Sequence, residues 1–167
     1  MNLPDQNKCS IAIVGLGYVG LPLALEFNDR KKWSKTNNYL NRKIFGFDIN
    51  QNRINELISG FDSTNENELN NPSIKFTDKF EDLICCDVFI VTVPTPINNS
   101  NNPDLKAIKG ASATVGKVLK LRNKYFIDQN KVVSNPIVIY ESTVYPGCTE
   151  EICVPIIKKE SELIPNI

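Results

Sequence analysis

Short apolar runs of β type alternate with amphipathic, helix-like segments along most of the chain. Strands are predicted near residues 10–14, 43–48, 74–76, 87–93 and 136–140, and helices near residues 18–28, 51–59, 78–83, 104–120 and 149–159. The run over 87–93 is almost continuously apolar, which is typical of a strand buried on both faces of a parallel sheet. The alternation predicts an α/β fold of the Rossmann type, in which helices cover both faces of a doubly wound, mainly parallel sheet. Such a fold binds its ligand in a crevice at the carboxyl ends of the strands.

Two of the predicted helices carry further signals. In the helix over 104–120, five positions fall on one stripe at helical spacing: Leu105, Ile108, Ser112, Val115 and Leu119. The helix that begins near Thr149 has acidic residues in its first turn, and Pro155 is expected to kink it. The polar stretches predicted to be solvated loops or helix extensions are 29–42, 63–72 and 121–135, and a loop beside the crevice is predicted over 97–103.

The most informative motif is a glycine-rich turn between the first predicted strand and the first helix. From Gly15 to Gly20 the sequence reads G-L-G-Y-V-G, a G-x-G-x-x-G pattern. In such a turn, Gly15 would let the chain leave the strand sharply, Gly17 would let backbone approach a pyrophosphate, and Gly20 would let the helix pack closely. The helix N-terminus would then offer free N–H groups and the positive end of its dipole to the phosphates. The strand before the motif and the helix after it strengthen the prediction of a dinucleotide site.

Composition narrows the possible functions. The chain has 167 residues, typical of one domain, and its formal net charge of zero gives no electrostatic signal for a nucleic-acid or membrane partner. The opening residues are polar and no apolar run is long enough to cross a bilayer, so we expect a cytoplasmic protein. The five cysteines form no C-x-x-C pair and are expected to be reduced thiols. Because histidine is absent, a Ser-His-Asp or Cys-His pair and a His-ligated zinc are excluded, and we expect no metal site.

An acidic residue lies at the tip of the second predicted strand. Asp48 is placed there to bind the ribose hydroxyls of an adenosine, and its carboxylate would repel a 2′-phosphate. It therefore favours NAD over NADP as the cofactor. Its alternative role is to cap the following helix, which Asn50 could do equally well. Arg53, one turn into that helix, could reach a phosphate, although a surface position is the default for an arginine there.

Two further loops follow predicted strands at the same edge of the sheet. The segment V-T-V-P-T-P, residues 91–96, cannot continue a strand, and Thr95 with the backbone around it could line the adenosine side of the crevice. After the fifth strand, the segment Y-E-S-T-V-Y-P-G, residues 140–147, would begin near a nicotinamide ring. The hydroxyl of Thr143 could hold a water or a substrate oxygen there, and structural capping is an equally good interpretation of the pattern.

Taken together and in this order, these motifs resemble the UDP-glucose/GDP-mannose 6-dehydrogenase family. The matching segments are G-L-G-Y-V-G-L-P-L-A at 15–24, G-F-D-I-N at 46–50 with Arg53, T-V-P-T-P-I at 92–97, P-D-L at 103–105 and Y-E-S-T-V-Y-P-G-C-T-E-E at 140–151. They are spread over most of the chain. They look most similar to the branch of the family that acts on UDP-N-acetylhexosamines for surface polysaccharides.

The resemblance implies an NAD-dependent oxidation of the sugar 6-hydroxyl to a carboxylate, which uses two NAD and passes through a thiohemiacetal on a cysteine. By residue matching, it implies cofactor-binding roles for Gly15, Gly17, Tyr18, Val19 and Gly20 at the pyrophosphate, for Asp48 and Arg53 on the adenosine ribose side, and for Val93, Pro94 and Thr95 along the cofactor. Thr143 would lie near the nicotinamide and the reacting oxygen, where its hydroxyl would position water or substrate.

One departure from the family pattern limits these expectations. The catalytic cysteine, lysine and asparagine of the family belong to later segments, and a sugar-binding C-terminal domain follows, whereas this chain ends near the family's sixth strand. None of the five cysteines occupies a nucleophile position of the family, and Cys148 is expected to be structural. We therefore expect a single NAD-binding domain over residues 1–167 that is inactive and monomeric on its own. Its parent would be a homodimeric enzyme with a UDP-sugar substrate.

Two other classes of protein remain open. A non-catalytic module that senses NAD or another nucleotide would need a partner interface, and no large apolar surface stripe is evident in the sequence. A methyltransferase also has a glycine-rich turn after its first strand and an acid after its second. Its glycine pattern is usually looser, and it would not account for the loops at 92–97 and 140–147.

Overall fold

The structure, a computed structural model, describes residues 2–30, 32, 39–64, 69, 72–97, 102–131 and 134–165. Its strands are β1 (Ser10–Val14), β2 (Lys43–Phe47), β3 (Ile74–Thr77), β4 (Val88–Val91) and β5 (Ile137–Tyr140). They form one parallel sheet with the order β3-β2-β1-β4-β5. Because β1 pairs with both β2 and β4, the strand order reverses at β1, as the doubly wound fold requires.

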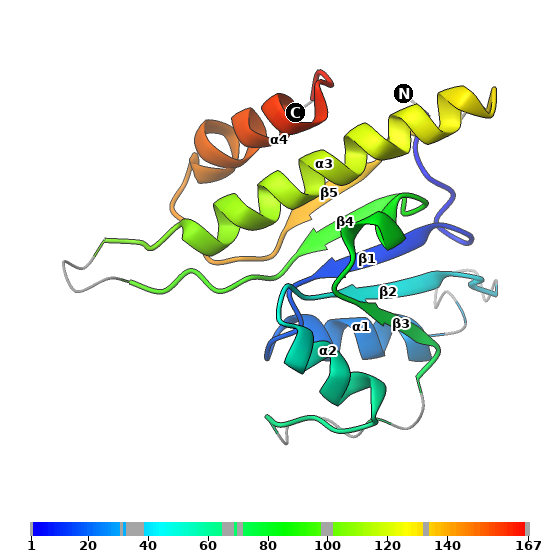
Figure 1. Cartoon of the computed structure of the whole chain (residues 1–167), viewed down its shortest axis with the longest axis vertical. Helices are drawn as coiled ribbons and strands as arrows, with labels where there is room; N and C mark the ends of the chain where they lie inside the picture. Colours follow the sequence, from blue (N-terminus) through cyan, green and yellow to red (C-terminus); the bar gives the residue numbers. More distant parts are fainter. Residues whose placement is uncertain are drawn as a thin grey trace.

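Helices cover both faces of the sheet, which confirms the predicted Rossmann-type architecture (Figure 1). The helical elements are α1 (Gly20–Asp29), α2 (Gln51–Ile58), the 3-10 helix η1 (Phe80–Leu83), α3 (Lys106–Asp128), the π-helical turn η2 (Thr149–Cys153) and α4 (Val154–Ser161). On one face, α1 contacts β1 and β2, and α2 contacts β3. On the other face, α3 contacts β4 and packs along α4. In the described part of the chain, no helix has the length and apolar character needed to cross a bilayer.

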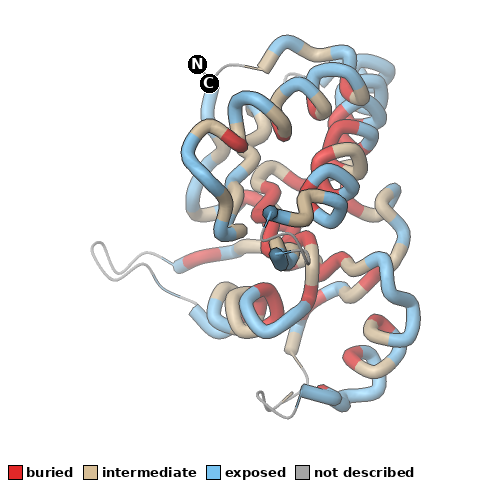
Figure 2. Tube along the Cα trace, turned by 90° about the vertical axis from the view of Figure 1, so that its left-hand side faces the viewer, coloured by how far each residue is buried: buried red, intermediate tan, exposed pale blue. Residues whose placement is uncertain are grey.

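The core forms two layers, one on each side of the sheet (Figure 2). Strand β4 contributes to both layers. Phe89 and Val91 pack in the layer beneath α3 and α4, whereas Ile90 between them faces the layer beneath α1 and α2. Alternate residues of β1 divide in the same way, since Ala12 and Ile13 fall in different layers. The central strands are therefore buried on both faces, as the continuous apolar run over 87–93 predicted.

Helix α3 is longer than the predicted helix over 104–120. It continues to Asp128, into the stretch 121–135 that the sequence assigned to a solvated loop or a helix extension. The extension is anchored by Arg122, whose buried side chain donates to Cys86 O and to the carboxylate of Asp87. Its guanidinium also lies over the ring of Phe126. These contacts with a distant part of the chain stabilise the helix beyond residue 120, although the local sequence there is polar.

The predicted helix over 149–159 consists of two elements, η2 and α4. The five residues of η2 form a π-helical turn, and Pro155 lies in the first turn of the α-helix that follows. A proline is tolerated at that position because the N–H groups of a first helical turn have no partner within the helix. The helical geometry thus changes next to Pro155, from the π-helical turn before it to the α-helix that contains it.

The remaining predicted elements differ from the structure mainly at their ends. The helix over 78–83 is reduced to η1, the helix over 18–28 begins at Gly20, and the strand over 87–93 is limited to β4. The predicted stripe of α3 is confirmed by burial, except that Leu105 is the N-cap residue; the buried members are Ile108, Ser112, Val115 and Leu119. Half of the polar stretch 29–42, and most of the stretch 63–72 and of the loop over 97–103, lie outside the described residues.

Candidate functional site

The five strands end in one row at the carboxyl edge of the sheet. Their pairing aligns Val14 with Phe47 and Val91, and these in turn with Thr77 and Tyr140. The segments that follow these five positions therefore leave the sheet at the same edge. All the residues predicted to bind a cofactor lie in four of these segments, the ones after β1, β2, β4 and β5. In a doubly wound sheet, this edge holds the ligand at the point where the strand order reverses.

The glycine turn follows β1 directly. Gly15 has a φ of +99°, which L side chains rarely adopt, so the sharp turn predicted there is confirmed. Its N–H donates to Phe47 O at 2.8 Å, and its carbonyl accepts the hydroxyl of the buried Thr92 at 2.7 Å. The turn is thereby attached to the end of β2 on one side and to the end of β4 on the other.

The other two glycines of the motif have different surroundings. A Cβ on Gly20 would lie 1.9 Å from Gly15 O, so the start of α1 can pack against the turn only if this residue is glycine. A Cβ on Gly17 would meet no described atom within 4 Å beyond its chain neighbours. The fold itself does not require glycine at that position, and the open space fits the predicted approach of a pyrophosphate to the backbone. Tyr18 and Val19 are exposed on the same turn.

Two charged side chains hold the backbone of Leu16, between the first two glycines. The Leu16 N–H donates to Asp48 Oδ2 at 2.8 Å, and Arg53 Nε donates to Leu16 O at 3.0 Å. The other carboxylate oxygen of Asp48 accepts the N–H of Asn50 at 2.9 Å. Asn50 is the residue that caps α2, because its side chain accepts from the N–H groups of Asn52 and Arg53. The carboxylate of Asp48 instead joins the tip of β2 to the glycine turn.

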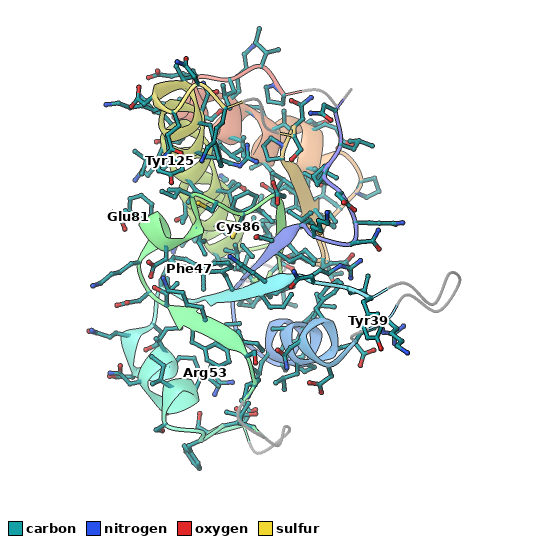
Figure 3. All side chains as sticks on the ribbon, turned by 90° about the vertical axis from the view of Figure 1, so that its right-hand side faces the viewer. Tyr39, Phe47, Arg53, Glu81, Cys86 and Tyr125 are labelled. Carbon is teal, nitrogen blue, oxygen red and sulfur yellow. The ribbon has the colours of Figure 1, made fainter. Side chains whose placement is uncertain are left out.

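Arg53 is not the surface residue that its helical position suggested. Its side chain is only 10% exposed, and Nη1 lies 2.8 Å from Oδ1 of the buried Asp62 and 3.4 Å from Glu56 Oε2. Its Nη2 atom is buried and has no hydrogen-bond partner among the described residues. Figure 3 shows Arg53 on the side of the sheet that carries α1 and α2. A buried guanidinium with one unused group beside the glycine turn fits a ligand that offers phosphate or ribose oxygens.

The loops after β4 and β5 are joined by neutral hydrogen bonds. The hydroxyl of Ser142 donates to Val93 O at 2.7 Å, and the hydroxyl of Thr95 donates to Thr143 O. Val93 packs partly against the core, whereas Pro94 is exposed. Thr143 is exposed too, and its hydroxyl makes no hydrogen bond to a described residue. The structure therefore brings together the residues predicted to line the cofactor in this half of the crevice.

Among the residues that the structure describes, no exposed thiol lies at this edge of the sheet. Cys148 and Cys153 lie beyond β5 and are fully buried, and burial raises the pKa of Cys153. Cys9 and Cys86 precede β1 and β4 at the opposite edge, and burial raises the pKa of both thiols. Cys85 is exposed but lies at that opposite edge as well. Among the residues that the structure describes, no group of three or more cysteine, aspartate or glutamate side chains could hold a metal ion.

The sequence assigns no role to three residues that organise the crevice, which are Thr92, Ser142 and Asp62. Thr92 and Ser142 are hydroxyl residues just beyond the last residues of β4 and β5, and a polar residue that ends an apolar strand is a usable signal. Asp62 lies at the start of a polar stretch, where a buried ion-pair partner and a solvated acid have the same local pattern. Its contact with Arg53, which the local pattern does not show, distinguishes the two.

Fold and site together define a class of protein, the Rossmann-type domains, a class whose members bind nucleotide cofactors where the strand order reverses. A more specific assignment comes from comparison with known families. The chain belongs to the UDP-glucose/GDP-mannose dehydrogenase family, because the model of the NAD binding domain of that family matches residues 9–166. The resemblance predicted from the motifs is thereby confirmed, and NAD is the cofactor of the domain.

Similar proteins support the same assignment. The chain is 50% identical over 157 residues to a UDP-N-acetyl-D-glucosamine 6-dehydrogenase of Pseudomonas aeruginosa, covering 92% of this chain and 32% of that protein. It is 46% identical over 158 residues to Protein CapL of Staphylococcus aureus, covering 93% of this chain and 32% of that protein. A solved UDP-glucose dehydrogenase from Pyrobaculum islandicum shares the fold, with a TM-score of 0.75 at 22% identity over 93% of this chain and 34% of that chain. The chain thus spans about a third of the length of the relatives it matches.

Proposed function

We propose that this chain supplies the NAD-binding part of an enzyme that oxidises the C6 hydroxyl of a UDP-N-acetylhexosamine or UDP-glucose to a carboxylate with two NAD. The strongest support is the 50% identity to a named UDP-N-acetyl-D-glucosamine 6-dehydrogenase. The complete enzyme would be a cytoplasmic homodimer, and its product would serve the biosynthesis of surface polysaccharides. A UDP-sugar would be its substrate.

The observation that carries the proposal is the arrangement around Leu16. Asp48 accepts the N–H of Leu16 and Arg53 donates to its carbonyl, and a Cβ on the adjacent Gly17 would enter open space. The pyrophosphate of NAD would lie over Gly17, where N–H groups at the start of α1 can donate to it. Each carboxylate oxygen of Asp48 accepts one backbone N–H, which leaves lone pairs for the ribose hydroxyls of the adenosine. The same carboxylate would repel a 2′-phosphate and so favour NAD over NADP.

The β4 and β5 loops would hold the other half of the cofactor. This moves Thr95 from the adenosine side expected from the sequence to the nicotinamide side, because its hydroxyl donates to Thr143 O on the β5 loop. NAD, when bound, supplies the hydride acceptor for the oxidation. Val93, Pro94 and Thr95 would line the cofactor, and the exposed hydroxyl of Thr143 would position a water or the reacting oxygen of the substrate. Because the described residues place no exposed thiol at this edge, we propose that residues 1–167 bind NAD without oxidising a UDP-sugar. We also propose that they are monomeric.

Calorimetric titration with NAD and NADP tests the proposed cofactor site. We expect NAD to bind, and NADP to bind at least roughly tenfold more weakly, a difference of about 1.4 kcal/mol. Asp48→Asn removes the negative charge while keeping the size of the side chain, so it should narrow that difference. S-adenosylmethionine serves as a control ligand that should not bind. The proposal would be contradicted if the chain did not bind NAD although circular dichroism showed it to be folded.

An activity assay tests the second part of the proposal. Residues 1–167 are incubated with NAD and UDP-N-acetylglucosamine, and NADH is followed by its absorbance. We expect no NADH, because the thiohemiacetal chemistry implied for the family needs a reactive cysteine at the crevice. Formation of NADH would contradict the proposal that residues 1–167 cannot oxidise a UDP-sugar.

A further inference from the structure

The backbone pairing of β4 with β5 stops where the crevice begins. Among the described residues, it ends with the N–H of Glu141 donating to Val91 O at 2.9 Å. Further along the β4 loop, Pro94 and Pro96 have no N–H with which a ladder could continue. Without other contacts between them, the two loops would be free to separate at this point.

Two side-chain hydroxyls take the place of further ladder bonds. Ser142 Oγ, on the β5 loop, donates to Val93 O at 2.7 Å, and Thr95 Oγ1, on the β4 loop, donates to Thr143 O. The two bonds run in opposite directions, so that each loop provides one hydroxyl and one carbonyl. Ser142 and Thr95, together with their two carbonyl acceptors, are called the hydroxyl clamp below.

We propose that Ser142 and Thr95 are positioning residues that set the geometry of the nicotinamide half of the cofactor site. The inference rests on the proposed function, since it concerns the same NAD site. The clamp holds Ser142, directly before Thr143, and also the carbonyl of Thr143 itself. The backbone that carries the exposed Thr143 hydroxyl is thereby fixed on both sides. In the same way, the clamp fixes Val93 and Thr95 on either side of Pro94.

The clamp is placed to affect binding more than stability. Both of its hydrogen bonds are neutral and join partly exposed or exposed loop residues, so water can replace a lost hydroxyl at its acceptor. The amino end of the β4–β5 pair is closed by separate contacts, because Asp87 Oδ1 accepts from both Ser134 and Arg122. Loss of the clamp should therefore change the position of the loops while leaving the sheet intact.

Comparison of two ligands tests this role. ADP contains the adenosine and diphosphate of NAD but no nicotinamide half, so it engages the glycine turn without the clamped loops. Ser142→Ala and Thr95→Val each remove one clamp hydroxyl from the 167-residue chain. By calorimetric titration, we expect each variant to bind NAD about threefold to tenfold more weakly than the wild type, the effect of one neutral hydrogen bond, and to bind ADP with unchanged affinity.

Two further variants serve as controls. Thr95→Ser keeps a hydroxyl at the same position and should retain most of the wild-type affinity for NAD. Ser134→Ala removes a hydroxyl near the amino end of β5, away from the crevice, and should bind both ligands as the wild type does. Together these controls show whether a loss of NAD affinity comes from losing a hydroxyl of the clamp or from losing any buried or loop hydroxyl of the domain.

The inference is overturned if both clamp variants bind NAD as tightly as the wild type, or if the wild type binds NAD no more tightly than ADP. It is also overturned if the affinities for NAD and ADP fall together, because that result indicates a general loss of structure. Failure of the wild type to bind either ligand would contradict the proposed function and this inference with it. The two conclusions can therefore fail separately and be told apart.

Discussion

The two halves of the crevice are held together by different kinds of hydrogen bond. On the β1–β2 side, the backbone of Leu16 lies between the carboxylate of Asp48 and the guanidinium of Arg53, which is also ion-paired with the buried Asp62. On the β4–β5 side, the hydroxyl clamp joins the loops through neutral groups alone. Charge therefore organises the half predicted to hold adenosine, and neutral hydroxyls organise the half that we propose holds nicotinamide.

This difference has a consequence for how the site would work. Hydrogen bonds with one charged partner are roughly twice as strong as neutral ones, and those of Arg53 are also shielded from water. The glycine turn is thus built to keep one geometry, whereas the clamped loops can adjust at a smaller cost. A fixed anchor for the phosphates beside an adjustable reacting end suits a cofactor that must be oriented against a substrate.

The largest effect is expected from the charged half. Arg53→Met keeps most of the length of the side chain but removes the cation beside the buried carboxylate of Asp62. Breaking a buried ion pair in this way should lower the free energy of unfolding by about 3 kcal/mol, measured by urea denaturation. Arg30→Met, which breaks an exposed ion pair with Glu26, is the matched control and should cost less than about 0.5 kcal/mol. If both variants lowered the free energy of unfolding by the same small amount, the charged contacts of the β1–β2 side would not be stronger than ordinary surface contacts.

The glycine turn gives the next effect and separates folding from binding. Gly20→Ala would place a methyl group 1.9 Å from Gly15 O, a backbone atom that cannot easily move, and this overpacking should cost about 2–3 kcal/mol in urea denaturation. Gly17→Ala meets no described atom within 4 Å and should keep the wild-type stability. In calorimetric titration, however, Gly17→Ala should weaken NAD binding by more than roughly tenfold, because its methyl group enters the space predicted for the pyrophosphate. Wild-type affinity in that variant would contradict the placement of the phosphates.

The features that the sequence predicts correctly are those that depend on neighbouring residues. The predicted strand over 10–14 coincides with β1, because a continuous apolar run followed by a glycine turn leaves little freedom in placing its ends. The positive φ of Gly15 and the close packing of Gly20 follow from the same short motif. Asp48 could be placed at the tip of β2 for a similar reason, since an acid directly after an apolar strand is a local pattern.

The features that cannot be predicted from the sequence depend on contacts between residues far apart in the chain. Nothing near Arg53 shows that its guanidinium is buried, because Asp62 lies in a polar stretch that also fits a solvated loop. The sequence left both a solvated loop and a helix extension open over 121–135, and the contact of Arg122 with Asp87 favours the extension. The donor and acceptor of each clamp bond likewise lie on different loops, so Ser142 could be placed at the strand tip without its partner being known.

A smaller effect is expected for a neutral hydrogen bond on the β4–β5 side. Ser112 Oγ donates to Ile108 O at 2.7 Å, so its 2.6 Å contact with Tyr140 Oη requires the tyrosine to be the donor. Tyr140→Phe removes this bond, keeps the ring in the core and should cost about 1 kcal/mol in urea denaturation. Tyr125→Phe changes an exposed ring on α3 and should have no measurable effect. A loss as large as that of Arg53→Met would contradict the contrast between charged and neutral contacts.

The smallest effect is a pH dependence that a charged contact shows and a neutral contact does not. Asp82 accepts hydrogen bonds from Lys75 and from Thr77 at the end of β3, and these bonds hold its pKa below the usual aspartate value. A carboxylate with a lowered pKa in the folded state contributes its full stability above the unfolded pKa and loses it as the pH falls through the folded pKa. Asp82→Asn should therefore cost about 0.5 kcal/mol at neutral pH, since the ion pair is partly exposed.

That cost should shrink once the pH falls below about 4, the usual aspartate pKa, and vanish when Asp82 is protonated in the folded state as well. The cost of Tyr140→Phe should stay constant over the same range, because burial raises the pKa of Tyr140 and its hydroxyl remains protonated throughout. Urea denaturation of both variants between neutral and acidic pH makes this comparison. A constant cost for Asp82→Asn, or a changing cost for Tyr140→Phe, would show that the Asp82 and Tyr140 contacts do not differ in charge as the structure indicates.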